Sequence, residues 1–216
     1  TGNNTVVTFR RIIFKNGFLE GTGAGSAIRA GGQVIIENCT FLNNQGESGT
    51  AVFLSPDADN SRINNCIFKG NKGIYAGEDD WVEGAAIDVH AGHVNITNSI
   101  FENNQALDTG GAINFAIQSV GSQLINCNFT NNTAPTGGAI KILNTDILIR
   151  NCKFINNKVN GSGGAVYIRN SKVKLENSIF TSNSANTNGG AIYNDLYNTS
   201  TTGYLNISSS NFKDNN

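Results

Sequence analysis

The sequence predicts an all-β protein, a right-handed parallel β-helix (a solenoid) of about eight rungs, from three observations. A Phe recurs at intervals of 25 to 33 residues along most of the chain. An Asn stands three residues after nearly every one of these Phe residues, and a Gly-Gly-Ala-Ile/Val motif recurs in phase with it. Segments of alternating apolar and polar residues connect the two motifs, which is the pattern of β-strands.

The Phe-x-x-Asn series marks one corner of each predicted rung. Its intervals are 27, 27, 33, 28, 25, 26 and 32 residues, and Gly17 replaces the Asn in the first copy only. The Phe residues are Phe14, Phe41, Phe68, Phe101, Phe129, Phe154, Phe180 and Phe212. We expect the Asn side chains to form a ladder of amides, and we expect Asn to tolerate the left-handed backbone that a sharp corner needs.

The glycine series marks a second corner. Complete Gly-Gly-Ala-Ile/Val motifs stand at 110–113, 137–140, 163–166 and 189–192, and weaker forms stand at 25–28, 49–52 and 84–87. Glycine suits a corner where positive φ or close packing excludes a Cβ. Both motifs are therefore interpreted as scaffold and not as site.

The segments between the corners are predicted strands. Residues 34–41, 94–101 and 173–180 align with one another and alternate with period two, with β-branched residues among them. Repeats of one period stack best in parallel and in register, about 4.8 Å apart, so inward Ile, Val and Phe should form columns. Four cysteines stand two residues before a repeat Phe and are expected to be inward, free thiols. These are Cys39, Cys66, Cys127 and Cys152.

Composition fits one elongated domain over residues 1–216. Charged residues make up 14% of the chain, against an ordinary value of about 25%, and the net charge is −1. Asn, with 35 copies, supplies the polar surface instead. No basic field is available to attract nucleic acid. Because the sequence starts at Thr1 and contains no Met, we interpret it as a fragment of a longer protein whose remainder anchors it to the cell envelope.

The pairing of Phe-x-x-Asn with Gly-Gly-Ala-Ile/Val resembles the repeats of chlamydial polymorphic outer membrane proteins and of adhesin-like surface proteins of methanogenic archaea. The resemblance extends from Phe14 to Asn215. It implies a β-helical stalk or adhesin that is secreted and stays at the cell surface, and not an enzyme. Its implied partner is the surface of another cell, a glycan or a protein receptor.

The longest interruption of the repeat is the corner insertion at residues 72–83. Its candidate ligand-binding residues are Tyr75, Glu78, Asp79, Asp80, Trp81 and Glu83. Stacking of adjacent rungs should bring Glu47 and Asp108 to the same side. Aromatic faces can stack on sugars, and carboxylates can accept hydroxyl hydrogen bonds or hold a cation. The alternative is a solvated acidic loop whose Trp81 covers an exposed edge of the core.

No cofactor or metal is expected. Calcium at the insertion remains an alternative, but it needs about six oxygens or more, and no recognisable calcium loop is present. His90 and His93 are the only histidines, and both are interpreted as surface loop residues.

An enzyme of the pectin lyase-like type is the less favoured alternative. A glycosidase needs two carboxylates about 5–9.5 Å apart across a substrate groove. The pair Asp79-Asp80 and the triplet at 144–146 resemble elements of polygalacturonases, but their order is reversed and the basic Arg-x-Lys element is missing. Arg150 and Arg169 could act as lyase bases only beside an acidic cluster. We therefore expect a non-catalytic cell-surface adhesin, with a passive spacer or a polysaccharide-active lyase or hydrolase as alternatives.

Overall fold

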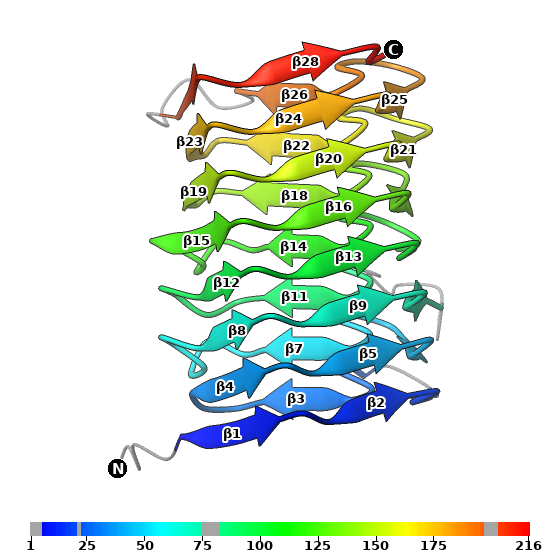
Figure 1. Ribbon diagram of the computed structural model, residues 1–216, viewed down its shortest axis with the longest axis vertical. Coiled ribbons are helices and arrows are strands. Elements are labelled where there is room, and N and C mark those ends of the chain that lie inside the picture. Colours follow the sequence, from blue (N-terminus) through cyan, green and yellow to red (C-terminus); the bar gives the residue numbers. More distant parts are fainter. Residues whose placement is uncertain (1–5, 21–22, 75–82, 197–202) are drawn as a thin grey trace.

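The computed structural model describes residues 6–20, 23–74, 83–196 and 203–216, and every regular element in these residues is a β-strand. The strands stack in layers along one axis, with the two ends of the chain at opposite ends of the stack (Figure 1). Strands of successive turns pair in parallel throughout. The chain is a right-handed β-solenoid of about seven turns, which confirms the predicted parallel β-helix. No helix in the described ranges is long and apolar enough to cross a membrane.

Three long parallel sheets run along the stack, two with eight strands and one with seven. The first sheet consists of β1 (Val7–Arg10), β4 (Val34–Glu37), β8 (Arg62–Asn64), β12 (Asn95–Thr97), β15 (Ser122–Ile125), β19 (Asp146–Arg150), β23 (Lys172–Glu176) and β27 (Tyr204–Ser208). The second sheet consists of β2 (Ile13–Lys15), β5 (Thr40–Leu42), β9 (Ile67–Lys69), β13 (Ile100–Glu102), β16 (Asn128–Thr130), β20 (Lys153–Ile155), β24 (Ile179–Thr181) and β28 (Asn211–Lys213). The third sheet consists of β3 (Ile28–Ala30), β7 (Val52–Leu54), β11 (Ile87–Val89), β14 (Ile113–Phe115), β18 (Ile140–Leu143), β22 (Val166–Arg169) and β26 (Ile192–Asp195).

Two-residue strands form short ladders at the corner between the second and third sheets. One ladder pairs β6 (Gln45–Gly46) with β10 (Lys72–Gly73). The other joins β17 (Thr133–Ala134), β21 (Lys158–Val159) and β25 (Ser184–Ala185). The predicted insertion begins in β10, so it interrupts the stack at this corner.

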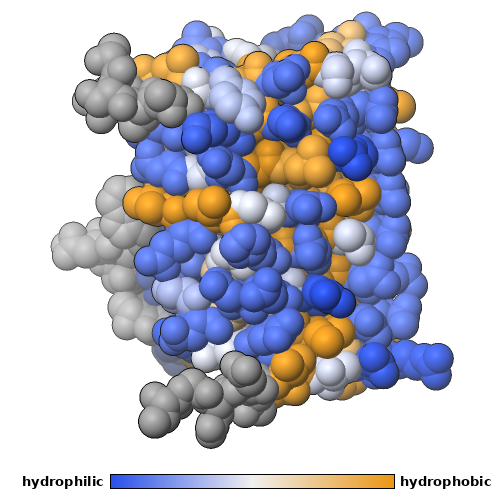
Figure 2. Space-filling model, turned by 90° about the vertical axis from the view of Figure 1, so that its left-hand side faces the viewer, coloured by the Kyte–Doolittle hydropathy of each residue, from blue (hydrophilic) through white to orange (hydrophobic). Residues whose placement is uncertain are grey.

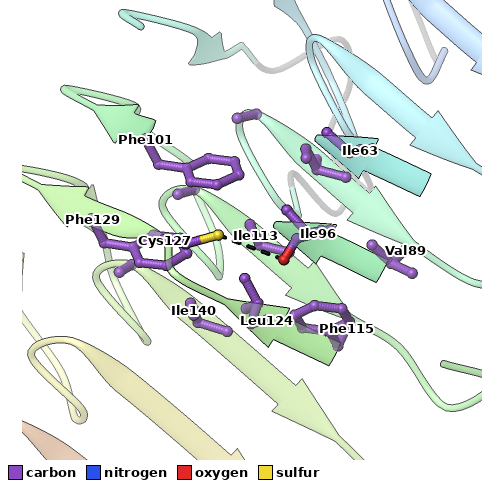
Figure 3. Packing of buried hydrophobic residues seen from close by; sticks show 14 of the residues in the cluster. Ile63, Val89, Ile96, Phe101, Ile113, Phe115, Leu124, Cys127, Phe129 and Ile140 are labelled. Carbon is purple, nitrogen blue, oxygen red and sulfur yellow. Dashed lines mark hydrogen bonds between the residues drawn. The ribbon is translucent and has the colours of Figure 1, made fainter. Parts of the chain in front are cut away.

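The repeat Phe residues form one continuous stack through the core. Strand register places Phe101 directly beside Phe129, and each neighbouring pair follows the same rule. Ring centroids of successive Phe residues from Phe14 to Phe212 lie 4.5–4.9 Å apart, and the rings are nearly parallel. This separation follows the spacing of strands within a sheet. Figure 3 shows Phe101 and Phe129 beside the inward Ile96 and Leu124, as predicted.

The Asn three residues after each Phe forms the predicted ladder. Asn132 shows its bonding. Its Nδ2 donates to Oδ1 of Asn157 at 3.1 Å and to the carbonyl of Phe101 at 3.0 Å. Its Oδ1 accepts from both the backbone N–H and Nδ2 of Asn104 at 3.0 Å. Every polar atom of this buried amide is therefore satisfied, which a buried polar group requires.

The expectation that the ladder Asn itself adopts the left-handed backbone was wrong. The left-handed residue is the one before it, for example Asn131 with φ 56° and Asn156 with φ 54°. The ladder Asn must instead point inward to bond its copies, so the chain turns one residue earlier, where the side chain faces solvent. Asn adopts this conformation more easily than other non-glycine residues. A second series of left-handed Asn follows the first-sheet strands: Asn38, Asn65, Asn98, Asn126, Asn151 and Asn177.

The two glycines of the second corner are required for different reasons. The first has positive φ, as at Gly110 with 64° and Gly137 with 63°. The second lies against the next turn, where a Cβ on Gly111 would come within 2.1 Å of the carbonyl oxygen of Gly138. Both reasons expected from the sequence therefore apply, one to each glycine.

The four cysteines are buried, free thiols, which confirms the prediction. Burial raises the pKa of Cys66 to about 11. Because the thiolate is the reactive form, this thiol should be chemically quiet at neutral pH.

Replacing one ring of the Phe stack should destabilise the protein. We expect Phe129→Ala to lower the free energy of unfolding by about 3–5 kcal/mol, since a fully buried ring is lost and a cavity remains. Denaturant unfolding measures the change. Phe18→Ala is the control, because Phe18 is 62% exposed and should cost little. Equal losses in the two variants would contradict the role of the stack.

Removing one rung of the Asn ladder should cost more than altering the exposed residue beside it. Asn132→Ala leaves the backbone N–H of Asn104 without its acceptor, and each unsatisfied buried group costs about 1–3 kcal/mol. Asn131→Gly should be close to neutral, because glycine accepts positive φ. Chemical denaturation of both variants tests this, together with hydrogen exchange at the amide of Asn104. If Asn132→Ala were as stable as Asn131→Gly, the energetic role of the ladder would be refuted.

Candidate functional site at the insertion corner

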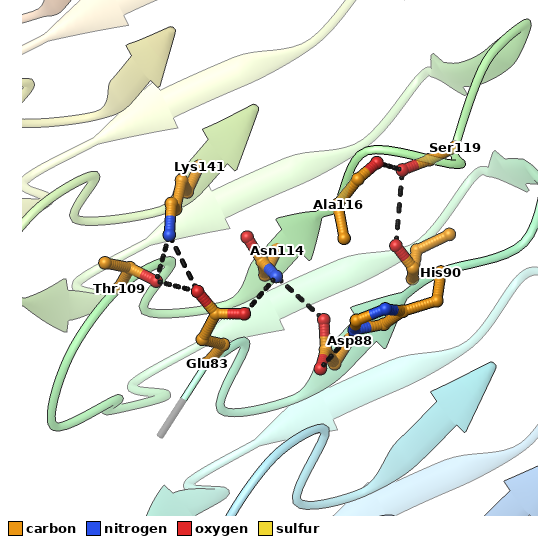
Figure 4. Close-up of polar contacts among 9 residues, drawn as sticks. Glu83, Asp88, His90, Thr109, Asn114, Ala116, Ser119 and Lys141 are labelled. Atoms are coloured by element: carbon orange, nitrogen blue, oxygen red, sulfur yellow. Dashed lines mark hydrogen bonds and ion pairs between the residues drawn. The ribbon is translucent and has the colours of Figure 1, made fainter. Parts of the chain in front are cut away.

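A group of polar side chains lies on the outer face of the third sheet, next to the end of the insertion (Figure 4). We call it the Glu83 cluster, and its members are Glu83, Asp88, His90, Thr109, Asn114 and Lys141. Strand register stacks Asp88, Asn114 and Lys141 in one column over three turns. Because side chains alternate along a strand, Ile87 and Val89 point into the core while Asp88 points outward.

One half of the Glu83 cluster is an ion pair. Lys141 Nζ lies 2.7 Å from Glu83 Oε1 and donates to Thr109 Oγ1 at 3.2 Å. The Thr109 hydroxyl lies 3.4 Å from Glu83 Oε1. The side chains of Lys141 and Glu83 are only 11% and 19% exposed. The pair therefore fixes the last residue of the insertion to β18, two turns further along the stack.

The other half is built around a buried carboxylate. Asp88 is 1% exposed, and its Oδ2 lies 3.1 Å from His90 Nε2. Asn114 Nδ2 donates to Asp88 Oδ1 at 2.8 Å and to Glu83 Oε2 at 3.0 Å. Asn114 thus joins the two halves of the cluster. Its own Oδ1 is buried and has no hydrogen-bond partner among the described residues.

The pKa shifts follow from burial and from these contacts. Burial raises the pKa of Asp88 above its usual value, against the opposing effect of its bond to His90. The hydrogen bond to Asp88 raises the pKa of His90. Burial also raises the pKa of Asp108, which Lys141 opposes. Carboxylates with shifted pKa values at one place are a feature of functional sites, although ion-pair networks produce them too.

The predicted site residues fall into two groups. Glu83 and Asp108 lie in the same region, since Lys141 and Glu83 both act electrostatically on Asp108. Glu47 lies one turn earlier at the same corner, two residues before Gly49, whose N–H donates to the Glu83 carbonyl at 3.0 Å. Tyr75, Glu78, Asp79, Asp80 and Trp81 lie outside the described residues, so their ligand-binding role stays a prediction.

Sequence reasoning missed most of the Glu83 cluster. His90 was interpreted as a surface loop residue, but it is half-buried, bonds to Asp88 and lies against the ring of Phe53. Asp88, Asn114 and Lys141 were not singled out. The signal was available, because each of them stands two residues after the Ala of a glycine-corner motif. Aligning the motifs would have placed the three side chains in one column.

The Glu83 cluster contains metal-type ligands. The ligand atoms of Glu83, Asp88 and His90 all lie within 4.8 Å of one another. Carboxylate oxygens and an imidazole nitrogen form a common ligand set for zinc and related ions.

Comparison with known proteins gives matches in both halves of the chain. The family model described as "Right handed beta helix region" matches residues 2–108. The model described as "Chlamydia polymorphic membrane protein (Chlamydia_PMP) repeat" matches residues 126–142, 151–169 and 177–195. No curated protein matches the chain. Among solved structures, trypsin-treated QnrB1, a plasmid-mediated fluoroquinolone resistance protein, aligns over 83% of both chains, with 14% identity and a TM-score of 0.25. That likeness is too weak to support an argument.

The contact between Asp88 and His90 should be visible in a pH titration. NMR of the His90 ring, without added metal, should give a pKa above 6.5, and Asp88→Asn should lower it by removing the carboxylate that favours the imidazolium. A raised histidine pKa stabilises the fold fully below pH 6.5, and this stability is lost as the pH rises through the folded pKa. Asp195→Asn is the control, since Asp195 bonds Arg169 and Tyr167 in another part of the sheet. An unchanged His90 pKa in Asp88→Asn would show that the contact is not made.

Proposed function

The chain carries repeats of the Chlamydia polymorphic membrane protein type on a right-handed β-helix, and from this premise we propose that it is a non-catalytic cell-surface adhesin domain. Its partner would be a glycan or a protein receptor on another cell, and the rest of the parent chain would anchor it to the envelope. The observation that carries the proposal is the repeat type itself, which indicates a surface-type β-helical protein. The character of the outer surface supports it.

Rows of amides along one edge of the solenoid support a role in binding hydroxyl-rich or peptide ligands. Asn65 Nδ2 donates to Asn38 Oδ1 at 2.6 Å, and Asn126 Nδ2 donates to Asn98 Oδ1 at 3.1 Å. Asn151 continues the row with a bond of 3.2 Å to Asn126. Amides carry both donors and acceptors, as sugars and peptides do. Hydrophilic residues also cover most of the face in Figure 2, with hydrophobic residues gathered in a few places.

Several exposed charges are paired between adjacent turns. Arg10 contacts Glu37 at 2.7 Å, and Lys69 contacts Glu102 at 3.0 Å. Each such pair adds little stability, but its two opposite charges cancel much of each other's electrostatic field. A surface of this kind supports a neutral glycan or a protein as partner. The net charge of −1 does not favour nucleic acid, whose binding depends on an excess of basic side chains.

The environment of the carboxylates supports a role without catalysis. Hydrolysis of a glycoside needs an acid and a base that both reach the sugar. Glu83 and Asp88 share the amide of Asn114, and the Asp88 side chain is 2% exposed. A substrate could not contact Asp88 without displacing that amide.

One observation favours a polysaccharide lyase as a second candidate. A groove on the outer face of the first sheet is lined by basic and acidic side chains, among them Asp146, Arg150, Lys172, Lys174 and Glu176. Arg150, however, contacts Glu176 at 2.8 Å, and this ion pair opposes its use as a base. Unsaturated product from pectate or alginate would support the lyase. Binding to such polymers without cleavage would be consistent with the adhesin.

Binding to whole cells and to a glycan array tests the proposal. We expect the chain to bind at least one cell type or glycan class, and we expect Asp79→Asn/Asp80→Asn/Trp81→Ala to reduce binding at least about tenfold, the effect of losing roughly 1.4 kcal/mol. This variant removes the acidic and aromatic groups of the predicted insertion site.

A matched control separates that site from general surface effects. Asp57→Asn/Asp214→Asn/Tyr204→Ala also removes two exposed carboxylates and an exposed aromatic residue, but elsewhere on the solenoid. It should bind as wild type does. Absence of binding by the wild-type chain across the whole panel would leave a passive spacer as the better description. Equal loss in both variants would reject the insertion as the binding surface.

A further inference from the structure

Three metal-type ligands come from one short stretch of the third turn. Glu83 lies at the corner, Asp88 is in β11, and His90 follows that strand by one residue. Asp88 and His90 are two residues apart on an extended chain, so their side chains point to the same face. Register then adds Asn114, directly beside Asp88 on β14. The fold therefore brings four potential ligands together from β11, its flanking residues and the adjacent strand β14.

Carboxylates outnumber basic groups at this place. The nearby charged groups are the carboxylates of Glu83, Asp88 and Asp108, the imidazole of His90 and the ammonium of Lys141. Lys141 is committed to Glu83 Oε1 at 2.7 Å. Asp88, which is 1% exposed, contacts only a neutral amide and an imidazole among the described side chains. A buried carboxylate is costly unless it is paired or coordinates a metal.

Asn114 gives an independent indication. The residue is 1% exposed, its amide lies between the two carboxylates, and its oxygen has no hydrogen-bond partner in the part of the chain that the structure describes. A half-turn of the amide about its last torsion would bring the oxygen to face Asp88 and Glu83. Three oxygens would then repel one another unless a cation lay among them. The same residue can therefore hold the carboxylates together without an ion and supply a ligand when an ion is bound.

We propose that Glu83, Asp88 and His90, completed by the side-chain oxygen of Asn114, form a site for a divalent transition-metal ion of the zinc type. The imidazole nitrogen selects such ions over calcium and magnesium, which prefer oxygen ligands only. Four ligands suit tetrahedral zinc, whose bonds of about 2.1 Å place ligand atoms about 3.4 Å apart. The 3.1 Å between His90 Nε2 and Asp88 Oδ2 is close to that separation. The bound ion would fix the end of the insertion to β11 and β14.

Titration calorimetry with Zn²⁺ on the 1–216 chain tests the site. We expect one Zn²⁺ per chain and at least tenfold weaker binding in Asp88→Asn and in His90→Phe. Both variants should fold, since Asn keeps the shape of Asp88 and a Phe ring can pack against Phe53 as His90 does. His93→Asn is the matched control, because it removes the other histidine and Asn tolerates its φ of 54°. This control should bind Zn²⁺ as wild type does.

Two further measurements keep the proposal testable if a variant fails to fold. Zn²⁺ should shift or broaden the His90 ring signals of the wild-type chain and leave those of His93 in place. Lys141→Met should bind Zn²⁺ more tightly, because it removes a positive charge next to Glu83. The proposal is overturned if wild type binds no Zn²⁺ at millimolar concentration. It also fails if binding depends on His93 instead of His90, or if Ca²⁺ binds at the same residues as tightly as Zn²⁺.

Discussion

The parallel, in-register stacking of strands at a single spacing controls the rest of this structure. At that spacing, about 4.8 Å, each side chain has its own copies as its nearest neighbours. A position in the repeat is therefore stable only if its side chain packs well against the same side chain in adjacent turns. Phe does so by stacking rings with centroids 4.5–4.9 Å apart. The ladder Asn does so because one amide carries both the donor and the acceptor that its copy needs.

The same constraint explains an unusual composition. Charged residues repel their copies, so a surface made of repeats needs a polar residue that tolerates itself, and Asn satisfies this requirement. Asn also serves the left-handed positions before the ladder and after the first-sheet strands. One residue type thus meets three needs: the inner ladder, the tight turn and the neutral surface. Some of the acidic and basic residues that remain are placed opposite one another on adjacent turns, as Arg150 and Glu176 are.

Chemistry can arise where the copies in a column are not identical. In the outward column of the third sheet, Phe53, Asp88, Asn114, Lys141 and Tyr167 follow one another. Strand register brings unlike groups into contact there, and the Glu83 cluster results. It lies at the corner where the repeat is longest, so the interruption and the polar cluster belong to one region. An ion bound there would position the insertion on an otherwise regular scaffold, which is compatible with a surface domain that binds through that insertion.

The sequence by itself determined the parallel β-helix, the Phe and Asn columns, the small inward cysteine positions and the roles of both corner glycines. It could do so because, in a stack of repeats, the spacing of motifs along the chain gives the register of strand pairing between turns directly. The tertiary structure decided two matters that spacing does not contain. It placed the left-handed residue one position before the ladder Asn, because the hydrogen bonds of the ladder fix the direction of that side chain. It also brought Glu83 and His90 into contact with the column of Asp88, Asn114 and Lys141, a column that the motif spacing implies. Their contact depends on which strand face points outward and on how deeply each side chain is buried, and those quantities are set by the folded stack.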